Sequence, residues 1–247
     1  MFQNFLKRLK INNYYRRQII NTSEWQNIDK KSYNFLIKDA EILTEDLYGY
    51  KVIKLKNGSI AKLFRLKRIL SSALIWPYAK RFVRGVSILK KYDIPTVTIT
   101  GLYKVNFIKR DMVIYRPLKG ESLRDIIKNK HDAGKIISEF ASFFAQLHRY
   151  GIYFRSIHFN NVFITQDRRF GLIDVADLNH SFIPFTLFKR ARNFKPIFRY
   201  EEDRSAIDSF SLDNFVDIYY KCSEIKSERK KATLKKMILR FYNKQIR

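Results

Sequence analysis

The sequence predicts an α+β fold in two parts, a strand-rich part followed by a helix-rich part. Short alternating segments dominate residues 41–115, whereas long helical patterns dominate residues 116–247. The pair Arg116-Pro117 breaks the pattern and marks a hinge between the two parts. Residues 1–40 are basic and polar and form a helical extension. Two lobes with a cleft between them favour a ligand at their junction.

The clearest local signal in the first part is a hairpin. Residues 50–56 alternate between apolar and polar side chains, Asn57-Gly58 follows, and residues 59–64 form a second short run. An Asn-Gly pair between two such runs is typical of a tight β-hairpin. Three further strands are predicted in this part, over residues 95–100, 102–108 and 112–115.

Helical patterns flank these strands and dominate the second part. We predict helices over residues 2–9, 66–92 with a break near Trp76-Pro77, 122–130 capped by Ser122, 133–148 closed by Gly151, and from Lys226 onward. The first of these is amphipathic and either docks on the protein or lies on a membrane. The last is very basic, with Leu234, Met237, Ile238 and Phe241 on one face.

Net charge is the strongest compositional signal. The chain of 247 residues carries 49 Lys and Arg against 23 Asp and Glu, which gives a formal net charge of +26. A surface this positive attracts anionic polymers and anionic membranes, and charge alone does not choose between them. A soluble protein that is merely basic is the plainer alternative. Because no zinc finger or known RNA motif is present, we expect no specific nucleic-acid partner.

Composition also bounds the class and compartment. A hydrophobic fraction of 46% supplies a sizeable core, so global disorder is excluded. Cys222 is the single cysteine, which excludes an internal disulfide and favours the reducing cytoplasm. No stretch approaches the ~20 uninterrupted apolar residues needed to span a bilayer. Lys7 and Arg8 interrupt the apolar N-terminal run, which argues against a secretory signal.

One stretch, residues 147–177, carries most of the candidate chemistry. A helix ends near Gly151, a polar loop follows, and Asn161 leads into a short strand. A second strand ends at Asp174. We expect the two strands to form a hairpin that brings an amide oxygen and a carboxylate oxygen to one point. Magnesium takes a few protein oxygens together with phosphates and water, so this pair predicts a Mg²⁺ site.

This stretch resembles the catalytic loop of protein kinases, H-R-D-x-x-x-x-N, followed by D-F-G. Residues 154–161 read Phe-Arg-Ser-Ile-His-Phe-Asn-Asn, and Asp174 begins the second motif. The resemblance implies a two-lobed protein-kinase-like fold. It places Asn161 and Asp174 on the metal-binding positions, with Asp177 as a further candidate ligand.

The same resemblance assigns an ATP site in the first part of the chain. Lys62 falls on the strand lysine that holds the nucleotide phosphates. The backbone from Arg116 to Leu118 falls on the inter-lobe segment that meets adenine. The implied cofactors are therefore ATP and Mg²⁺.

Four segments narrow the resemblance to a family, namely residues 61–68, 115–124, 153–158 and 171–177. They resemble the bacterial lipopolysaccharide-core kinases, a family that includes proteins labelled toluene-tolerance kinases. The resemblance covers residues 41–204 and implies phosphoryl transfer to a heptose or Kdo hydroxyl of the lipopolysaccharide inner core, or of a related envelope glycolipid. The positive surface would hold the enzyme at the cytoplasmic face of the inner membrane. Residues 187–193, with Lys195 and Arg199, are expected to contact acidic sugars or phosphates of this acceptor.

The chain also departs from the kinase pattern. Ser156 stands where a kinase has its catalytic aspartate, and no Asp or Glu lies between Lys62 and Asp93 to pair with the lysine. No glycine-rich G-x-G-x-x-G loop precedes Lys62. A general base contributes about 10²–10⁴-fold, so its loss weakens a kinase without abolishing it. His158 is a candidate replacement, because an unperturbed histidine titrates near pH 6.5.

Alternative interpretations stay open at this point. The first is a pseudokinase that binds nucleotide, a membrane or a partner without turnover. The second is a nucleic-acid-binding protein, and the third is an aminoglycoside-type phosphotransferase, whose cationic substrates suit a charge of +26 poorly. Individual residues have structural alternatives too, with His158 as a hydrogen-bonding histidine, Asn161 and Asp177 as turn residues, and His148 bonded to backbone. Ser156 as a nucleophile lacks the expected Ser-His-Asp order.

Overall fold

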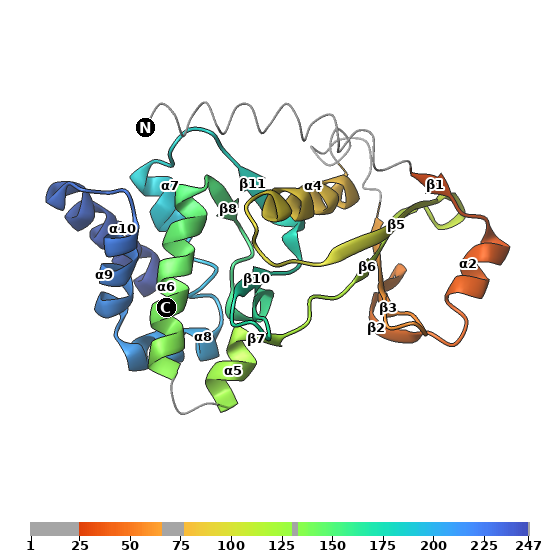
Figure 1. Ribbon diagram of the computed structural model, residues 1–247, viewed down its shortest axis with the longest axis horizontal. Coiled ribbons are helices and arrows are strands. Elements are labelled where there is room, and N and C mark those ends of the chain that lie inside the picture. The colour runs from red at the N-terminus through yellow and green to blue at the C-terminus, as the bar shows by residue number, and fades with distance from the viewer. Residues whose placement is uncertain (1–24, 66–76, 130–132, 247) are drawn as a thin grey trace. The chain divides into compact units, whose positions relative to one another are not determined.

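The computed structural model describes residues 25–65, 77–129 and 133–246 (Figure 1). Two compact units are present and are described separately. Unit 1 comprises Met1–Lys91 and Thr96–Leu118, and unit 2 comprises Tyr92–Pro95 and Lys119–Arg247. The fold class is α+β as predicted, with a six-stranded sheet in unit 1 and mostly helices in unit 2. The helix predicted over residues 2–9 and the first part of the one predicted over 66–92 lie outside the described residues.

The sheet of unit 1 has the strand order β1-β5-β6-β4-β3-β2. Its strands are β1 (Gln26–Asn27), β2 (Glu41–Asp46), β3 (Gly49–Lys54), β4 (Ile60–Arg65), β5 (Thr98–Val105) and β6 (Arg110–Arg116). The short β1 pairs in parallel with β5, and the other neighbours are antiparallel. The predicted hairpin is confirmed as β3–β4, with the Leu55 N–H donating to the Ser59 carbonyl at 2.8 Å and Gly58 at φ 77°.

One strand prediction in unit 1 was wrong. The segments over residues 95–100 and 102–108 are not two strands, because β5 runs through Gly101. A register shift between Ile99 and Gly101 leaves Thr100 as the extra residue of a bulge, and Gly101 itself pairs with Ile114. The last three predicted residues form instead a 3₁₀ turn over Asn106–Ile108.

A helix covers each face of this sheet. The side chain of Tyr33 from α2 (Lys30–Leu36) joins a buried cluster on one face, with Ile53, Ala61, Leu63 and Met112. On the opposite face, Phe82 of α4 (Tyr78–Lys91) packs against Phe64 and Tyr115. Because side chains alternate along a strand, Lys62 shares the α4 face with Phe64.

Unit 2 is built around helix α6. Its helices are α5 (Leu123–Asn129), α6 (Ala133–Arg149), α7 (Leu187–Arg192), α8 (Glu201–Phe210), α9 (Leu212–Cys222) and α10 (Glu228–Ile246). The α6 rings of Phe140 and Phe144 contact Phe159, Phe194, Phe215 and Tyr219. Ser122 caps α5 as predicted, since its Oγ accepts the Asp125 N–H at 3.1 Å.

Short strands position the loop that carries the candidate site. They are β7 (Glu121–Ser122), β8 (Ile152–Phe154), β9 (Val162–Ile164), β10 (Phe170–Leu172) and β11 (Leu178–His180). The predicted hairpin is β9–β10, and β8 pairs with β11. The loop from β8 to β9 and the turn from β10 to β11 therefore come from two pairs of hydrogen-bonded strands. None of the helices in the described segments is long and apolar enough to cross a membrane.

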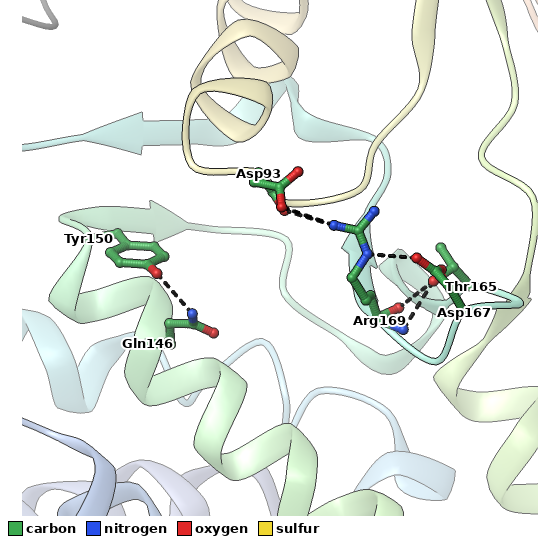
Figure 2. Close-up of polar contacts among 6 residues, drawn as sticks. All are labelled: Asp93, Gln146, Tyr150, Thr165, Asp167 and Arg169. Carbon is green, nitrogen blue, oxygen red and sulfur yellow. Dashed lines mark hydrogen bonds and ion pairs between the residues drawn. The ribbon is translucent and has the colours of Figure 1, made fainter.

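The segment Tyr92–Pro95, which follows α4 in sequence, belongs to unit 2 and is tied to the β9–β10 hairpin. The Leu172 N–H donates to the Pro95 carbonyl at 2.9 Å. Figure 2 shows the second tie, in which Arg169 contacts Asp93 at 3.1 Å and Asp167 at 2.7 Å. These ion pairs are solvent-exposed and contribute little each, so the backbone bond is the firmer attachment.

Candidate functional site

The side-chain amide of Asn161 is held by two hydrogen bonds inside the loop. Its Nδ2 donates to the Ser156 carbonyl at 2.9 Å and lies 3.1 Å from Nε2 of His158. A carbonyl oxygen only accepts hydrogen bonds, so the atom that faces Ser156 must be the amide nitrogen. The same nitrogen then donates its second hydrogen to His158. Asn161 Oδ1 takes no part in either bond and is left to accept a ligand.

This geometry fixes the state of His158. Its Nε2 accepts from Asn161, so the neutral ring carries its proton on Nδ1. Nδ1 is buried and has no hydrogen-bond partner within the described part of the chain. Burial lowers the pKa of His158, and the nearby Asp203 opposes that shift. A role as general base stays a prediction, and it requires that Asn161 first releases the Nε2 lone pair.

Ser156 and Asp177 contact each other across the loop. The Ser156 hydroxyl donates to Asp177 Oδ2 at 3.3 Å, and the Arg155 N–H donates to the Asp177 carbonyl at 3.5 Å. Asp177 lies in the 3₁₀ turn Val175–Asp177 and thereby ties that turn to the loop. Ser156, at the position of the kinase catalytic aspartate, and Asp177, the further candidate metal ligand, are therefore partners of one another.

Asp174 stands where the chain leaves β10, and its carboxylate is exposed. Its backbone is left-handed, with φ 52° and ψ 46°, a conformation that Asp adopts more readily than most residues. The preceding Ile173 N–H donates to the Asn161 carbonyl at 3.1 Å. The predicted hairpin therefore brings the backbones of Asn161 and Asp174 together.

The donors in this region suit a hard cation. Asn161 offers an amide oxygen and Asp174 and Asp177 offer carboxylate oxygens, which are the ligand types that Mg²⁺ takes together with phosphate and water. Across residues 25–65, 77–129 and 133–246, no three His, Cys, Asp or Glu side chains gather as a complete protein cage.

Sequence reasoning missed the carboxylate that anchors the loop. Asp203 of α8 is fully buried, and its two oxygens accept from Arg124 Nε at 2.8 Å and from the Phe159 N–H at 3.0 Å. The pattern did contain a signal, because Asp203 lies four residues before the buried Ile207 on the same helix face. An acid on an apolar face must find partners.

The Tyr200 ring packs against two side chains of this region, the charged Arg124 and the neutral His158. The Arg124 guanidinium carbon lies 4.6 Å from the Tyr200 ring centroid, and the His158 ring lies edge-on at 5.0 Å. Arg124 Nη2, like His158 Nδ1, is buried without a hydrogen-bond partner in the described segments. The aromatic ring stabilises the guanidinium through a cation–π contact.

His148 is part of the core and lies away from the loop chemistry. Its Nε2 donates to Asn193 Oδ1 at 3.0 Å and its Nδ1 accepts from the Tyr219 hydroxyl at 2.7 Å. The Asn193 Nδ2 donates in turn to the Phe154 carbonyl, at the end of β8. The sequence predicts backbone partners for His148, but both of its ring nitrogens bond to side chains. Burial lowers the pKa of His148 to about 3.

The predicted acceptor segment is only partly accessible. Arg192 and Arg199 are exposed. Arg190 is buried at 4% exposure and donates to Tyr219 Oη and the Phe185 carbonyl. Arg190 therefore supports the core, and the exposed cations around it are the ones left for an acidic acceptor.

The nucleotide-binding candidates lie in unit 1. Lys62 is on β4, Arg116 ends β6, and Leu118 is the last residue of the unit. Lys62 Nζ lies 5.7 Å from the ring centroids of both Phe64 and Phe82. Phe82 belongs to α4, the helix on which a kinase carries the paired glutamate. The predicted convergence of Lys62 with Asn161 and Asp174 joins the two units and stays a prediction.

A buried carboxylate occurs elsewhere on this face of the sheet. Asp111 of β6 pairs in register with Phe64 and is 7% exposed. Burial raises the pKa of Asp111, and the positive charges of Lys104 on β5 and Lys80 on α4 oppose that shift.

The order of elements follows the one that the kinase resemblance predicts. A strand with a lysine and a helix lie in the sheet-bearing unit, and the β8–β9 loop and a hairpin followed by Asp174 lie in the helical unit. No protein-family model and no curated protein matches the chain.

Solved kinase structures do match. One is a divergent kinase lacking the glycine-rich loop, which regulates membrane ultrastructure of the Toxoplasma parasitophorous vacuole. It has 15% identity and a TM-score of 0.45, over 96% of this chain and 84% of its own. Another is the bifunctional kinase-methyltransferase WbdD, with 13% identity and a TM-score of 0.46, over 90% of this chain and 51% of its own.

Proposed function

We propose that this protein is an ATP-dependent phosphotransferase that phosphorylates a sugar hydroxyl of the lipopolysaccharide core or of a related envelope glycolipid. The observation that carries the proposal is the Asn161 amide, whose nitrogen is held at 2.9 Å by the Ser156 carbonyl while Oδ1 is left for a cation. The backbone of Asp174 is joined to the same residue through Ile173. The LPS substrate rests on the sequence resemblance and on the positive charge.

Each residue has a defined task in this proposal. Lys62 would bind the nucleotide phosphates, and the backbone from Arg116 to Leu118 would bind adenine. Asn161 and Asp174, with Asp177 as a helper, would hold Mg²⁺, which supplies charge neutralisation on the transferring phosphoryl group. The Asp203 carboxylate would keep the loop in place through its bond to the Phe159 N–H.

The acceptor hydroxyl needs little help from a base. The transition state of phosphoryl transfer is loose, so positioning and charge stabilisation supply most of the rate. With Ser156 bonded to Asp177 and His158 bonded to Asn161, we expect a slow enzyme. An anionic glycolipid acceptor would place the protein at the cytoplasmic face of the inner membrane.

A pseudokinase is the second candidate, and two observations favour it. The loop has a serine in place of the aspartate, and the His158 lone pair is engaged. Such a protein would bind nucleotide and signal through a membrane or partner without turnover.

One pair of measurements separates these candidates. The first is the rise in melting temperature caused by Mg·ATP, and the second is transfer of radiolabelled γ-phosphate to inner-core lipopolysaccharide, with Asp174→Asn as the control. We expect stabilisation and transfer, both lost in the variant. Stabilisation without transfer would establish the pseudokinase. No stabilisation and no transfer would refute both nucleotide-based functions.

A further inference from the structure

The helix α10 is strongly charged on one side and buried on the other. Over Glu228–Ile246 it carries seven Lys and Arg residues against one Glu. Leu234 and Ile238 are fully buried, and the Tyr220 hydroxyl donates to the Lys231 carbonyl. The helix is therefore packed against the rest of unit 2 through one side, and its opposite side faces away from these contacts.

Four cations form what we call the α10 basic face. Arg229, Lys236, Arg240 and Lys244 are all exposed. Their spacings of seven, four and four residues place them on one side of the helix, opposite Leu234 and Ile238. A rigid helix thus presents them as a row and not as independent side chains on a loop.

No carboxylate in the described residues, 25–65, 77–129 and 133–246, forms an ion pair with any of the four cations of the α10 basic face. The lysines nearer the body of unit 2 behave differently, since Lys231 pairs with Glu228 at 2.6 Å and Lys235 pairs with Asp213 at 3.0 Å. Four like charges held in a row repel one another, and an external polyanion would relieve that repulsion.

Large apolar side chains border this face. Leu239, next to Arg240, is 36% exposed. The neighbouring helix α7 packs against α10 and presents Phe188, which is 56% exposed and lies 6.0 Å from the Phe241 ring centroid. Exposed side chains of this kind insert at the headgroup boundary of a bilayer, whereas contacts to a nucleic-acid backbone are made by cations and polar groups. The border therefore favours a lipid surface over RNA.

We propose that α10 docks on an anionic lipid bilayer, with its basic face against the headgroup phosphates and with Leu239 and Phe188 at the boundary. Basic residues near such a surface act additively, and four of them strengthen partitioning about 10³-fold. This inference concerns a surface of unit 2 alone. Its test is therefore independent of the test of the proposed phosphotransfer.

The test compares two variants that lose the same charge at different places. One carries Arg229→Gln, Lys236→Gln, Arg240→Gln and Lys244→Gln. The matched control carries Gln at four exposed lysines of unit 1, namely Lys30, Lys31, Lys38 and Lys56. Circular dichroism confirms that both are folded. Each full-length protein is sedimented with vesicles of phosphatidylcholine containing one quarter phosphatidylglycerol, and with vesicles of phosphatidylcholine alone.

We expect wild type and the unit 1 control to bind the anionic vesicles, and the α10 variant to bind about 10³-fold more weakly. The double variant Leu239→Ser, Phe188→Ser should lose the binding that persists at high salt. Equal weakening of both charge variants would overturn the proposal, because it would show an effect of net charge alone. Unchanged vesicle binding with lost binding to single-stranded RNA would overturn it in favour of nucleic acid.

Discussion

Asn161 and His158 set each other's orientation, and this pair is the best-defined feature of the site. A purely local motif predicted that residues 154–161 form one loop, and Asn161 does bond to Ser156 across it. The Asp203 anchor could not be predicted in the same way, because it lies 44 residues from Phe159 in sequence. Only the folded chain shows which of several acids on α8 turns inward.

The first prediction concerns the acceptor that His158 supplies to Asn161. His158→Ala leaves one amide hydrogen of Asn161 without a partner, so the amide loses its fixed orientation. A hydrogen bond of this kind contributes about 0.5–1.5 kcal/mol, so we expect Mg·ATP to bind roughly 2- to 13-fold more weakly by calorimetry. His158→Gln, which retains an acceptor oxygen, should recover part of that affinity. Equal affinity of wild type and His158→Ala would show that His158 does not position Asn161.

The second prediction concerns pH. His148 has a folded-state pKa of about 3 against 6.5 when unperturbed. Because the unfolded chain binds the proton and the folded chain does not, the stability from this group is complete above pH 6.5 and is lost as the pH falls toward 3. Between pH 7 and pH 5 we expect a loss of about 2 kcal/mol in the free energy of unfolding. The lowered pKa of His158 acts in the same direction.

The control for this pH dependence is His148→Gln. It removes the titrating group. Below pH 6.5, the slope of unfolding free energy against pH, measured by urea titrations, should therefore fall by an amount that corresponds to nearly one bound proton. An unchanged slope would contradict the assignment of a buried, neutral His148.

At the scale of elements, alternation and turn chemistry predicted the β3–β4 and β9–β10 hairpins. The two-residue strand β1 could not be predicted, because two residues carry no periodicity. β5 was divided wrongly because Gly101 interrupts its pattern, and pairing along β6 overrides that local signal. The periodicity of apolar residues thus shows where an element lies, whereas the strands with which it pairs determine where it ends.

The third prediction concerns the approach of β7 to β9. Gly120 has φ 147°, and an added Cβ would lie 2.3 Å from the Ile164 carbonyl oxygen. Gly120→Ala must therefore displace β9, the strand that follows Asn161, and backbone strain alone costs about 1–3 kcal/mol. Gly58→Ala is the matched control, since Gly58 also has a positive φ but nothing within 4 Å of its Cβ position. We expect a clearly larger drop in melting temperature for Gly120→Ala, and equal drops would contradict the close approach.

At the scale of the whole molecule, the charge of +26 was visible in the composition, but its distribution was not. The structure shows that Lys231 and Lys235 form ion pairs while the outer row of α10 forms none among the described residues. It also shows that Arg190 is structural. Charge counts predict that a polyanion binds, and only geometry shows which cations are available to it.

We propose that Lys62 of unit 1 and Asp174 of unit 2 hold a single nucleotide. Binding of Mg·ATP to wild type, Lys62→Ala, Asp174→Asn and the double variant tests it by calorimetry. If both residues hold one triphosphate, each single variant should bind weakly. The double variant should then show a coupling of about 0.5–3 kcal/mol between the two sites. Strictly additive losses, or Mg·ATP affinity that neither substitution alters, would contradict the account.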